Sequence, residues 1–195
     1  MRRSLGQLGP AIRTMLLLTV LLGLAYPLAV TGIAQVALPG RADGSLVRAH
    51  GRLVGSSLIG QSFGTDRRYF WSRPSVAGMA GYDPLATGAS NLALDNPTLV
   101  KAVEQRQAAA VRADGVARSD VPPDAVTASG SGLDPQISPA YAAIQVRRVA
   151  QARGLSVAVV RALVEQHTQG RTLGFLGEPR VDVLALNLAL DRATG

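Results

Sequence analysis

The chain has 195 residues, of which 20 are Lys or Arg, 13 are Asp or Glu and none is Cys, and its formal net charge is +7. This length accommodates one folded domain together with a tail or a membrane anchor. The lack of cysteine excludes a disulfide framework and a thiolate metal site. Because basic and acidic residues are interspersed beyond the first forty residues, we expect no nucleic-acid partner.

The N-terminal part of the chain is strongly apolar. Residues 14–40 contain no charged side chain and are dominated by Leu, Ala and Val. A membrane-spanning helix needs about 20 apolar residues, whereas the apolar core of a cleaved signal peptide has about 7–15. The sequence therefore predicts an uncleaved transmembrane helix over residues 14–38. Cleavage after the small residues near Ala34 and Ala37 is the alternative, and we expect Pro27 to kink the helix.

Charges before the predicted helix indicate its orientation. Arg2, Arg3 and Arg13 precede it without an acidic residue, which favours a cytoplasmic N-terminus under the positive-inside rule. Further arginines follow the helix closely, but long domains cross membranes regardless of such charges. We therefore expect residues 1–13 in the cytoplasm and a soluble domain over residues 39–195 on the other side of the membrane, in the periplasm or at the cell exterior.

The soluble part combines strand and helix patterns. Two β-like runs flanking His50-Gly51 predict a hairpin. A long irregular stretch follows, whose aromatic residues Tyr69, Phe70 and Trp71 are expected to anchor it to the core. The C-terminal run "RVDVLALNLALD" predicts a strand with a short helix.

Three helices are predicted from their start signals. Asn96, Ser138 and Ser156 are suitable N-caps, and a proline occupies the first helical position after two of them. Gly154 and Gly170 are the expected ends of the second and third helices. The fold class is therefore α+β, a single N-terminal transmembrane helix followed by one mixed α/β extracytoplasmic domain.

A serine- and glycine-rich segment precedes the second of these helices. Its backbone amides could form an anion-binding nest, and Arg147 and Arg148 lie on the helix that follows. A P-loop needs a lysine followed by Ser or Thr, but Leu133 and Asp134 stand here, and Asp134 would repel phosphate. The residues favour a structural turn, with nucleotide contact as the alternative. The candidate nucleotide-binding residues of this turn are Ser129, Gly130, Ser131 and Gly132.

Hydrolytic chemistry is a further alternative. Ser131 could act as a nucleophile with His167 as its base, in a membrane-tethered serine hydrolase. Neither Ser129 nor Ser131 lies in a Gly-x-Ser-x-Gly elbow. With two histidines far apart and no cysteine, zinc ligation is also disfavoured. We therefore predict no catalytic residue and no metal site.

Several segments, taken in order, resemble the C subunit of the bacterial Kdp potassium-transporting ATPase. The resemblance extends from about residue 14 to residue 191, and the ordered set is specific although each fragment alone is weak. The segments read "LLGLAYPLAVTGIAQ", "GSSLIGQSF", "YFWSRPS", "GASNLALDNPTL", "TASGSGLDPQISPAYAAIQVRRVAQARG" and "LGFLGEPRVDVLALNLALD".

This resemblance implies an accessory subunit with no cofactor of its own. Its implied partners are a potassium-translocating subunit, a P-type ATPase subunit, a small membrane peptide and the lipid bilayer. The family is conventionally assigned the role of a catalytic chaperone that raises the ATP affinity of the ATPase subunit. That role implies ATP at the interface between the two subunits, contacted by the serine-glycine turn and by Gln145. A periplasmic domain could not reach cytoplasmic ATP, so the topology argument favours a clamp that stabilises the complex.

Overall fold

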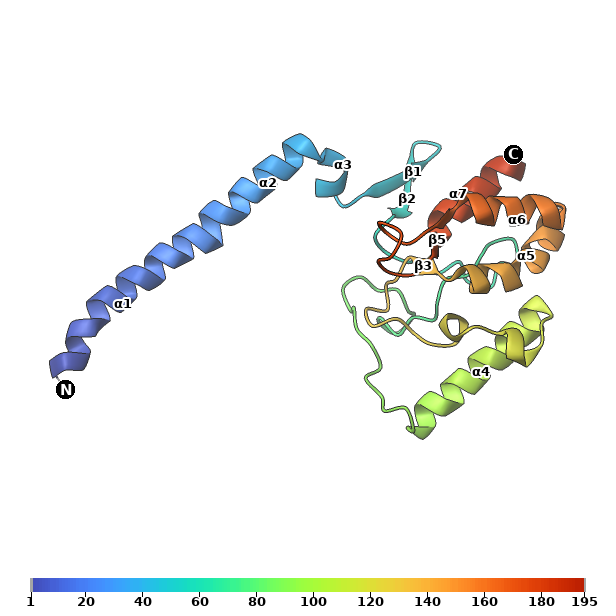
Figure 1. Ribbon diagram of the computed structural model, residues 1–195, viewed down its shortest axis with the longest axis horizontal. Coiled ribbons are helices and arrows are strands. Elements are labelled where there is room, and N and C mark those ends of the chain that lie inside the picture. Colours follow the sequence, from blue (N-terminus) through green and yellow to red (C-terminus); the bar gives the residue numbers. More distant parts are fainter. Residues whose placement is uncertain (1, 195) are drawn as a thin grey trace. The chain divides into compact units, whose positions relative to one another are not determined.

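The computed structural model describes residues 2–194 (Figure 1). The chain divides into two compact units, one ending at Leu46 and the other beginning at Val47. The smaller unit is predominantly helical, and the larger one contains helices, short strands and a long irregular segment. The mixed α/β character predicted from the sequence is confirmed.

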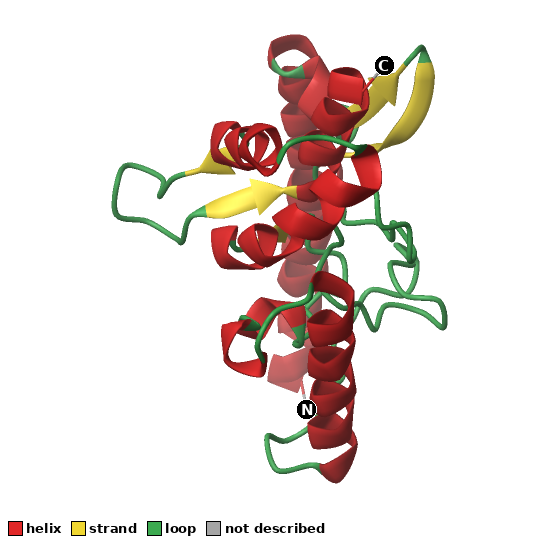
Figure 2. Cartoon of the chain, turned by 90° about the vertical axis from the view of Figure 1, so that its right-hand side faces the viewer, coloured by secondary structure: helices red, strands yellow, loops and turns green. Residues whose placement is uncertain are grey.

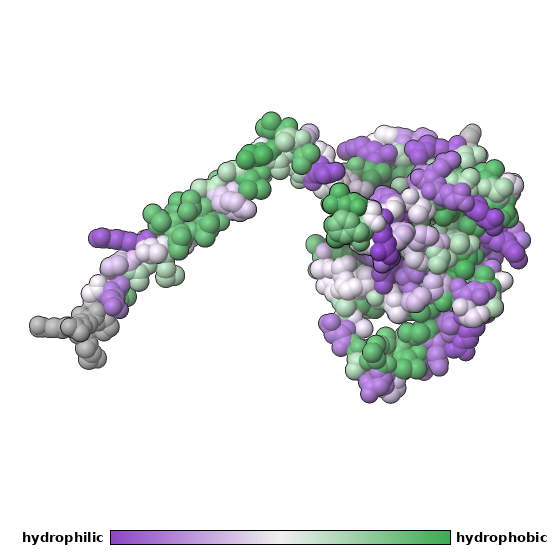
Figure 3. Space-filling view, in the orientation of Figure 1, coloured by the Kyte–Doolittle hydropathy of each residue, from purple (hydrophilic) through white to green (hydrophobic). Residues whose placement is uncertain are grey.

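One long helix makes up most of the smaller unit. It comprises α1 (Arg2–Val20), a π-helical stretch (Leu21–Ala25) and α2 (Tyr26–Ala37). The segment Gly6–Ala37 is long and apolar enough to cross a membrane, and none of its most apolar part is buried inside the protein. On the face seen in Figure 3, hydrophobic residues lie along much of this helix. A bilayer is the environment that suits such a surface.

The predicted irregularity at Tyr26-Pro27 takes the form of a π-helical turn. Proline has no amide hydrogen with which to close an α-helical bond to Gly23. The turn Leu21–Ala25 ends directly before the Tyr26-Pro27 pair, and the Tyr26 amide donates to the carbonyl of Leu21, five residues back. The wider turn thus accommodates the proline while the helix continues to Ala37. A four-residue helix, α3 (Pro39–Ala42), follows.

Short strands form two small sheets. β1 (Leu46–Ala49) and β2 (Arg52–Ser56) are the predicted hairpin, and both residues of its turn, His50 and Gly51, have positive φ. A second, antiparallel sheet has the order β3-β5-β4. Its strands are β3 (Gln136–Ile137), β4 (Thr168–Gln169) and β5 (Arg180–Asp182).

The larger unit contains four longer helices, which confirm the predicted start signals. They are α4 (Pro97–Asp114), α5 (Pro139–Arg153), α6 (Val157–Gln166) and α7 (Val183–Thr194). The side chains of Asn96, Ser138 and Ser156 each accept a hydrogen bond from a backbone amide in the first helical turn. Gly154 ends α5 in the left-handed conformation, as expected.

Two helix boundaries differ from the prediction. Helix α6 ends at Gln166 rather than at Gly170, because Thr168 and Gln169 pair with β5 instead. The C-terminal helix is much longer than expected, at 12 residues, because the apolar residues after β5 pack into the core at helical spacing. The core is built mainly from α5, α6, α7 and β5.

A buried ion pair joins the end of α4 to α5. The Nε atom of Arg148 lies 2.7 Å from Oδ1 of Asp114, and both side chains are almost completely excluded from solvent. The guanidinium carbon lies 3.8 Å from the ring centroid of Trp71, a cation–π contact. Nη1 donates to the carbonyls of Arg67 and Tyr69, each at 2.9 Å. Burial lowers the pKa of Arg148, while its bond to Asp114 opposes that shift.

Replacing Arg148 should destabilise the domain strongly. Arg148→Met leaves the Asp114 carboxylate buried without its partner, which costs about 3–5 kcal/mol of unfolding free energy. Urea unfolding of the full chain in detergent, followed by circular dichroism, measures this loss. The double variant Arg148→Met/Asp114→Leu should recover part of it, since no charge is then left unpaired. Equal stability of Arg148→Met and the unmodified chain would contradict this account.

Candidate functional site

The serine-glycine turn is held by its own hydrogen bonds. The amide of Gly132 donates to the carbonyl of Ser129 at 3.2 Å, and the amide of Leu133 donates to Oγ of Ser131 at 3.1 Å. Gly132 has a φ of 69°, in the left-handed region that favours glycine. The segment is therefore an ordered turn whose geometry depends on a glycine at its end.

Three residues of the preceding irregular segment tie this turn to the domain. Oγ of Ser75 donates to the carbonyl of Gly132 at 2.6 Å. The carbonyl of Ser131 accepts from the amide of Gly88 at 2.9 Å and from Oγ1 of Thr87 at 2.8 Å. Two carbonyls of the turn therefore serve as acceptors within the fold, and the turn links segments that lie far apart in the sequence.

The four residues of the turn differ in exposure. Ser129 and Gly132 are buried, whereas Gly130 and Ser131 are exposed. A cavity of about 390 Å³ lies beside the turn and is bordered by Ser129, Gly130 and the first part of α4. Among the described residues that line it, only Arg106 carries a charge, and its Nη1 donates to the carbonyl of Val126 at 3.0 Å. The cavity thus offers little to neutralise a phosphate.

Gln145 lies in the interior, with none of its side chain exposed. Its Oε1 accepts from the amide of Trp71 and from Nη2 of Arg148, both at 2.7 Å. Its Nε2 donates to the carbonyls of Trp71 at 3.2 Å and Tyr141 at 3.3 Å. The side-chain amide is thus fully hydrogen-bonded inside the protein, and the structure does not bring it together with the exposed part of the turn.

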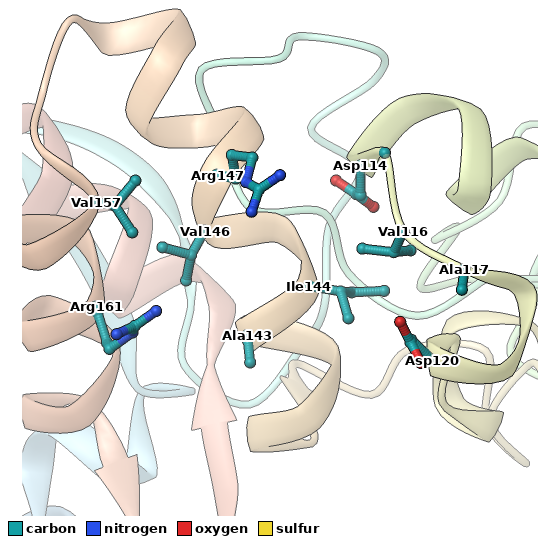
Figure 4. Close-up of a pocket in the computed structure, with 11 residues that line it drawn as sticks. Asp114, Val116, Ala117, Asp120, Ala143, Ile144, Val146, Arg147, Val157 and Arg161 are labelled. Atoms are coloured by element: carbon teal, nitrogen blue, oxygen red, sulfur yellow. The ribbon is translucent and has the colours of Figure 1, made fainter.

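Neither of the two arginines on the helix after the turn contacts the turn among the described residues. Arg148 is the buried partner of Asp114. Arg147 lines a separate cavity of about 410 Å³, between α5, α6 and the chain that follows α4. In Figure 4 its side chain and that of Arg161 extend into this space, with Asp120 on the other side. An anion at the serine-glycine turn would therefore lack the expected cations.

The residues of the hydrolase alternative lie in different environments. Nδ1 of His167 lies 2.8 Å from the carbonyl of Leu163. His167 also lines a cavity of about 230 Å³ with Asp182, and burial raises the pKa of that carboxyl. Ser131 is not among the residues that line this cavity. No cluster of three or more His, Asp or Glu side chains suited to a metal ion occurs among residues 2–194.

Comparison with known proteins identifies the family. The family model described as the c chain of the K⁺-transporting ATPase, KdpC, matches residues 8–192. The chain belongs to the KdpC family. A potassium-transporting ATPase KdpC subunit from Sorangium cellulosum is 58% identical over 97% of this chain and 99% of its own length. The corresponding subunit from Kineococcus radiotolerans is 58% identical over 92% of this chain and 90% of its own length.

The sequence analysis missed a second surface of this KdpC-family domain. A groove of about 880 Å³ is bordered by Arg73, by β3 and by the residues that lead into β5. The loop before β5 carries exposed apolar side chains. The available signal was the segment "LGFLGEPR", in which large apolar residues stand among glycines and charges rather than in a periodic pattern.

The two glycines of the turn should respond differently to substitution. A Cβ atom at Gly132 would lie 2.8 Å from Cβ of Ala77 and 3.0 Å from the carbonyl oxygen of Gly88, whereas one at Gly130 would meet nothing within 4 Å. Gly132→Ala should therefore lower the unfolding free energy by about 1–3 kcal/mol. Gly130→Ala, the matched control, should change it by less than about 0.5 kcal/mol. Thermal unfolding of both variants compares them, and equal effects would contradict the geometry.

Proposed function

We propose that this chain is a non-catalytic subunit that stabilises an assembled potassium-transporting ATPase from the outer side of the membrane. Membership of the KdpC family makes it a subunit of that ATPase. The proposed partners are a potassium-translocating subunit, a P-type ATPase subunit and a small membrane peptide. The apolar segment Gly6–Ala37 would anchor the chain in the bacterial inner membrane beside them.

This proposal rests on Gln145, whose side-chain amide makes all of its hydrogen bonds inside the fold. A catalytic chaperone that contacts ATP through the serine-glycine turn and Gln145 would need both on one surface. The Gln145 amide instead makes four hydrogen bonds to neighbouring groups and is wholly buried. Releasing it for a ligand would leave buried backbone groups of Trp71 without partners, at a cost of about 1–3 kcal/mol each.

The catalytic chaperone remains the second candidate because part of the turn is accessible. Gly130 and Ser131 are exposed, and Gly130 borders a cavity. Under this alternative ATP would lie at the interface with the ATPase subunit, and the domain would have to face the cytoplasm. Serine hydrolysis has less support, since Ser131 and His167 share neither a hydrogen bond nor a cavity in the part of the chain described.

The orientation of the domain can be tested directly. We expect a cysteine in place of exposed Ala193 to react with a membrane-impermeant maleimide in intact cells whose outer membrane has been made permeable. Arg2, Arg3 and Arg13, which precede the uncharged residues 14–40, favour this outcome. A cysteine introduced at Leu5, before the segment, is the control and should react only after lysis. The reverse pattern would place the domain in the cytoplasm and favour the chaperone.

The ATP dependence of the assembled complex separates the two functions. If the turn is structural, Ser131→Ala loses one hydrogen bond to the amide of Leu133, worth about 0.5–1.5 kcal/mol, and should leave the KM for ATP unchanged. Gln145→Ala should impair folding or assembly instead. Potassium-stimulated ATP hydrolysis and size-exclusion chromatography of each variant complex provide the measurements. A several-fold rise in KM with assembly intact would support the chaperone and overturn the structural role.

A further inference from the structure

The loop between β4 and β5 exposes large apolar side chains. Figure 2 shows it projecting from the body of the domain, where it leads into the strand that continues directly as α7. Leu173 is 79% exposed, Phe175 is 68% exposed and Leu176 is 48% exposed. Three neighbouring apolar side chains on a projecting loop are a feature of contact sites rather than of ordinary solvent-facing loops.

This loop is ordered by its own contacts. Thr172 and Leu176 exchange two backbone hydrogen bonds of 2.9 Å, and Arg171 forms an ion pair of 2.7 Å with Glu178. Leu173 has a φ of 55°, which is uncommon for a residue with a branched side chain. Strained backbone of this kind persists where the surrounding structure requires it, and it clusters at contact sites. The apolar side chains are therefore held in a defined outward arrangement.

A groove adjoins the base of the loop. It has a volume of about 880 Å³, and Glu178 and Arg180 line it together with Arg73. Nε of Arg73 is buried and has no hydrogen-bond partner within the described residues, although Nη1 of the same side chain pairs with Asp134 at 3.1 Å. Because this nitrogen has no exposed surface, a partner chain cannot reach it, and Arg73 forms part of the wall of the groove.

The carboxylates of the groove are already engaged. Asp124 accepts from the amide and the hydroxyl of Ser138, at 2.7 and 2.9 Å. Asp134 is paired with Arg73, and Glu178 with Arg171. The cation left to a ligand is thus the guanidinium of Arg180, which lines the groove and forms no ion pair among the described residues. The surface is complementary to an apolar segment with an oxygen acceptor.

We infer that this surface, the loop of residues 171–178 with the adjoining groove, docks an extended apolar polypeptide segment of a partner subunit. A backbone carbonyl or carboxylate of that segment accepts from the guanidinium of Arg180, while its apolar side chains cover Phe175 and its neighbours. A lipid surface fits less well, because the exposed Glu178 at the base of the loop would have to leave water and acyl chains supply no acceptor. This inference rests on the proposed function as a subunit.

A photoreactive benzoylphenylalanine at position 175 tests the contact in the full chain, expressed with the other subunits. We expect a crosslink to a segment of one partner subunit that mass spectrometry can locate. The same group at position 94 is the control, since Leu94 is 92% exposed and lies outside the surface. Crosslinks from position 175 only to lipid, only to a second copy of this chain, or to nothing in an assembled complex would each overturn the inference.

Substitutions then measure the contribution of each part. Phe175→Ser should weaken retention of this chain in the detergent-purified complex by about tenfold, and Leu94→Ser should leave it unchanged. Arg180→Gln removes the positive charge of the groove that is left for a partner, and it should also weaken retention. Unchanged retention for both Phe175→Ser and Arg180→Gln would overturn the docking surface alone. Failure of the unmodified chain to assemble with any partner would instead overturn the proposed function.

Discussion

The buried guanidinium of Arg148 is the constraint on which the domain depends. It pairs with Asp114 at the end of α4, stacks on the Trp71 ring and is buried away from solvent. A charge in this position is tolerated only because each nitrogen has a hydrogen-bond partner and the guanidinium lies against the Trp71 ring. The same contacts fix the end of α4, the middle of α5 and the irregular segment that precedes α4 in one arrangement.

Amide side chains perform a related task for the same irregular segment. Gln145 on α5 forms hydrogen bonds with both the amide and the carbonyl of Trp71. Asn187 on α7 does the same for Phe70: its Oδ1 accepts from the amide at 2.8 Å, and its Nδ2 donates to the carbonyl at 2.9 Å. Each amide supplies one donor and one acceptor to one residue, as a neighbouring strand would. This arrangement explains how a stretch without regular secondary structure can be buried, since its polar backbone groups are satisfied.

Structural features that depend on neighbouring residues could be predicted from the sequence, whereas features that depend on contacts between distant residues could not. Helix starts at Asn96, Ser138 and Ser156 were predictable because an N-cap acts within its own turn. By contrast, Gln145 stands 74 positions from the residue whose backbone it satisfies. Nothing in a helical pattern distinguishes a buried amide of this kind from a ligand-binding one, so its structural role could not be read from the sequence.

The bond between Asn187 and Phe70 has a consequence for how the protein is made. The two residues are 117 positions apart, and Arg153 and Tyr69 both contact Asp191, close to the end of the chain. The irregular segment is therefore synthesised long before the helix that holds it. Because the closing contacts join distant positions, the domain reaches its final packing only after residues 187–191 have left the ribosome. Until then the aromatic side chains near residue 70 are accessible to both chaperones and proteases.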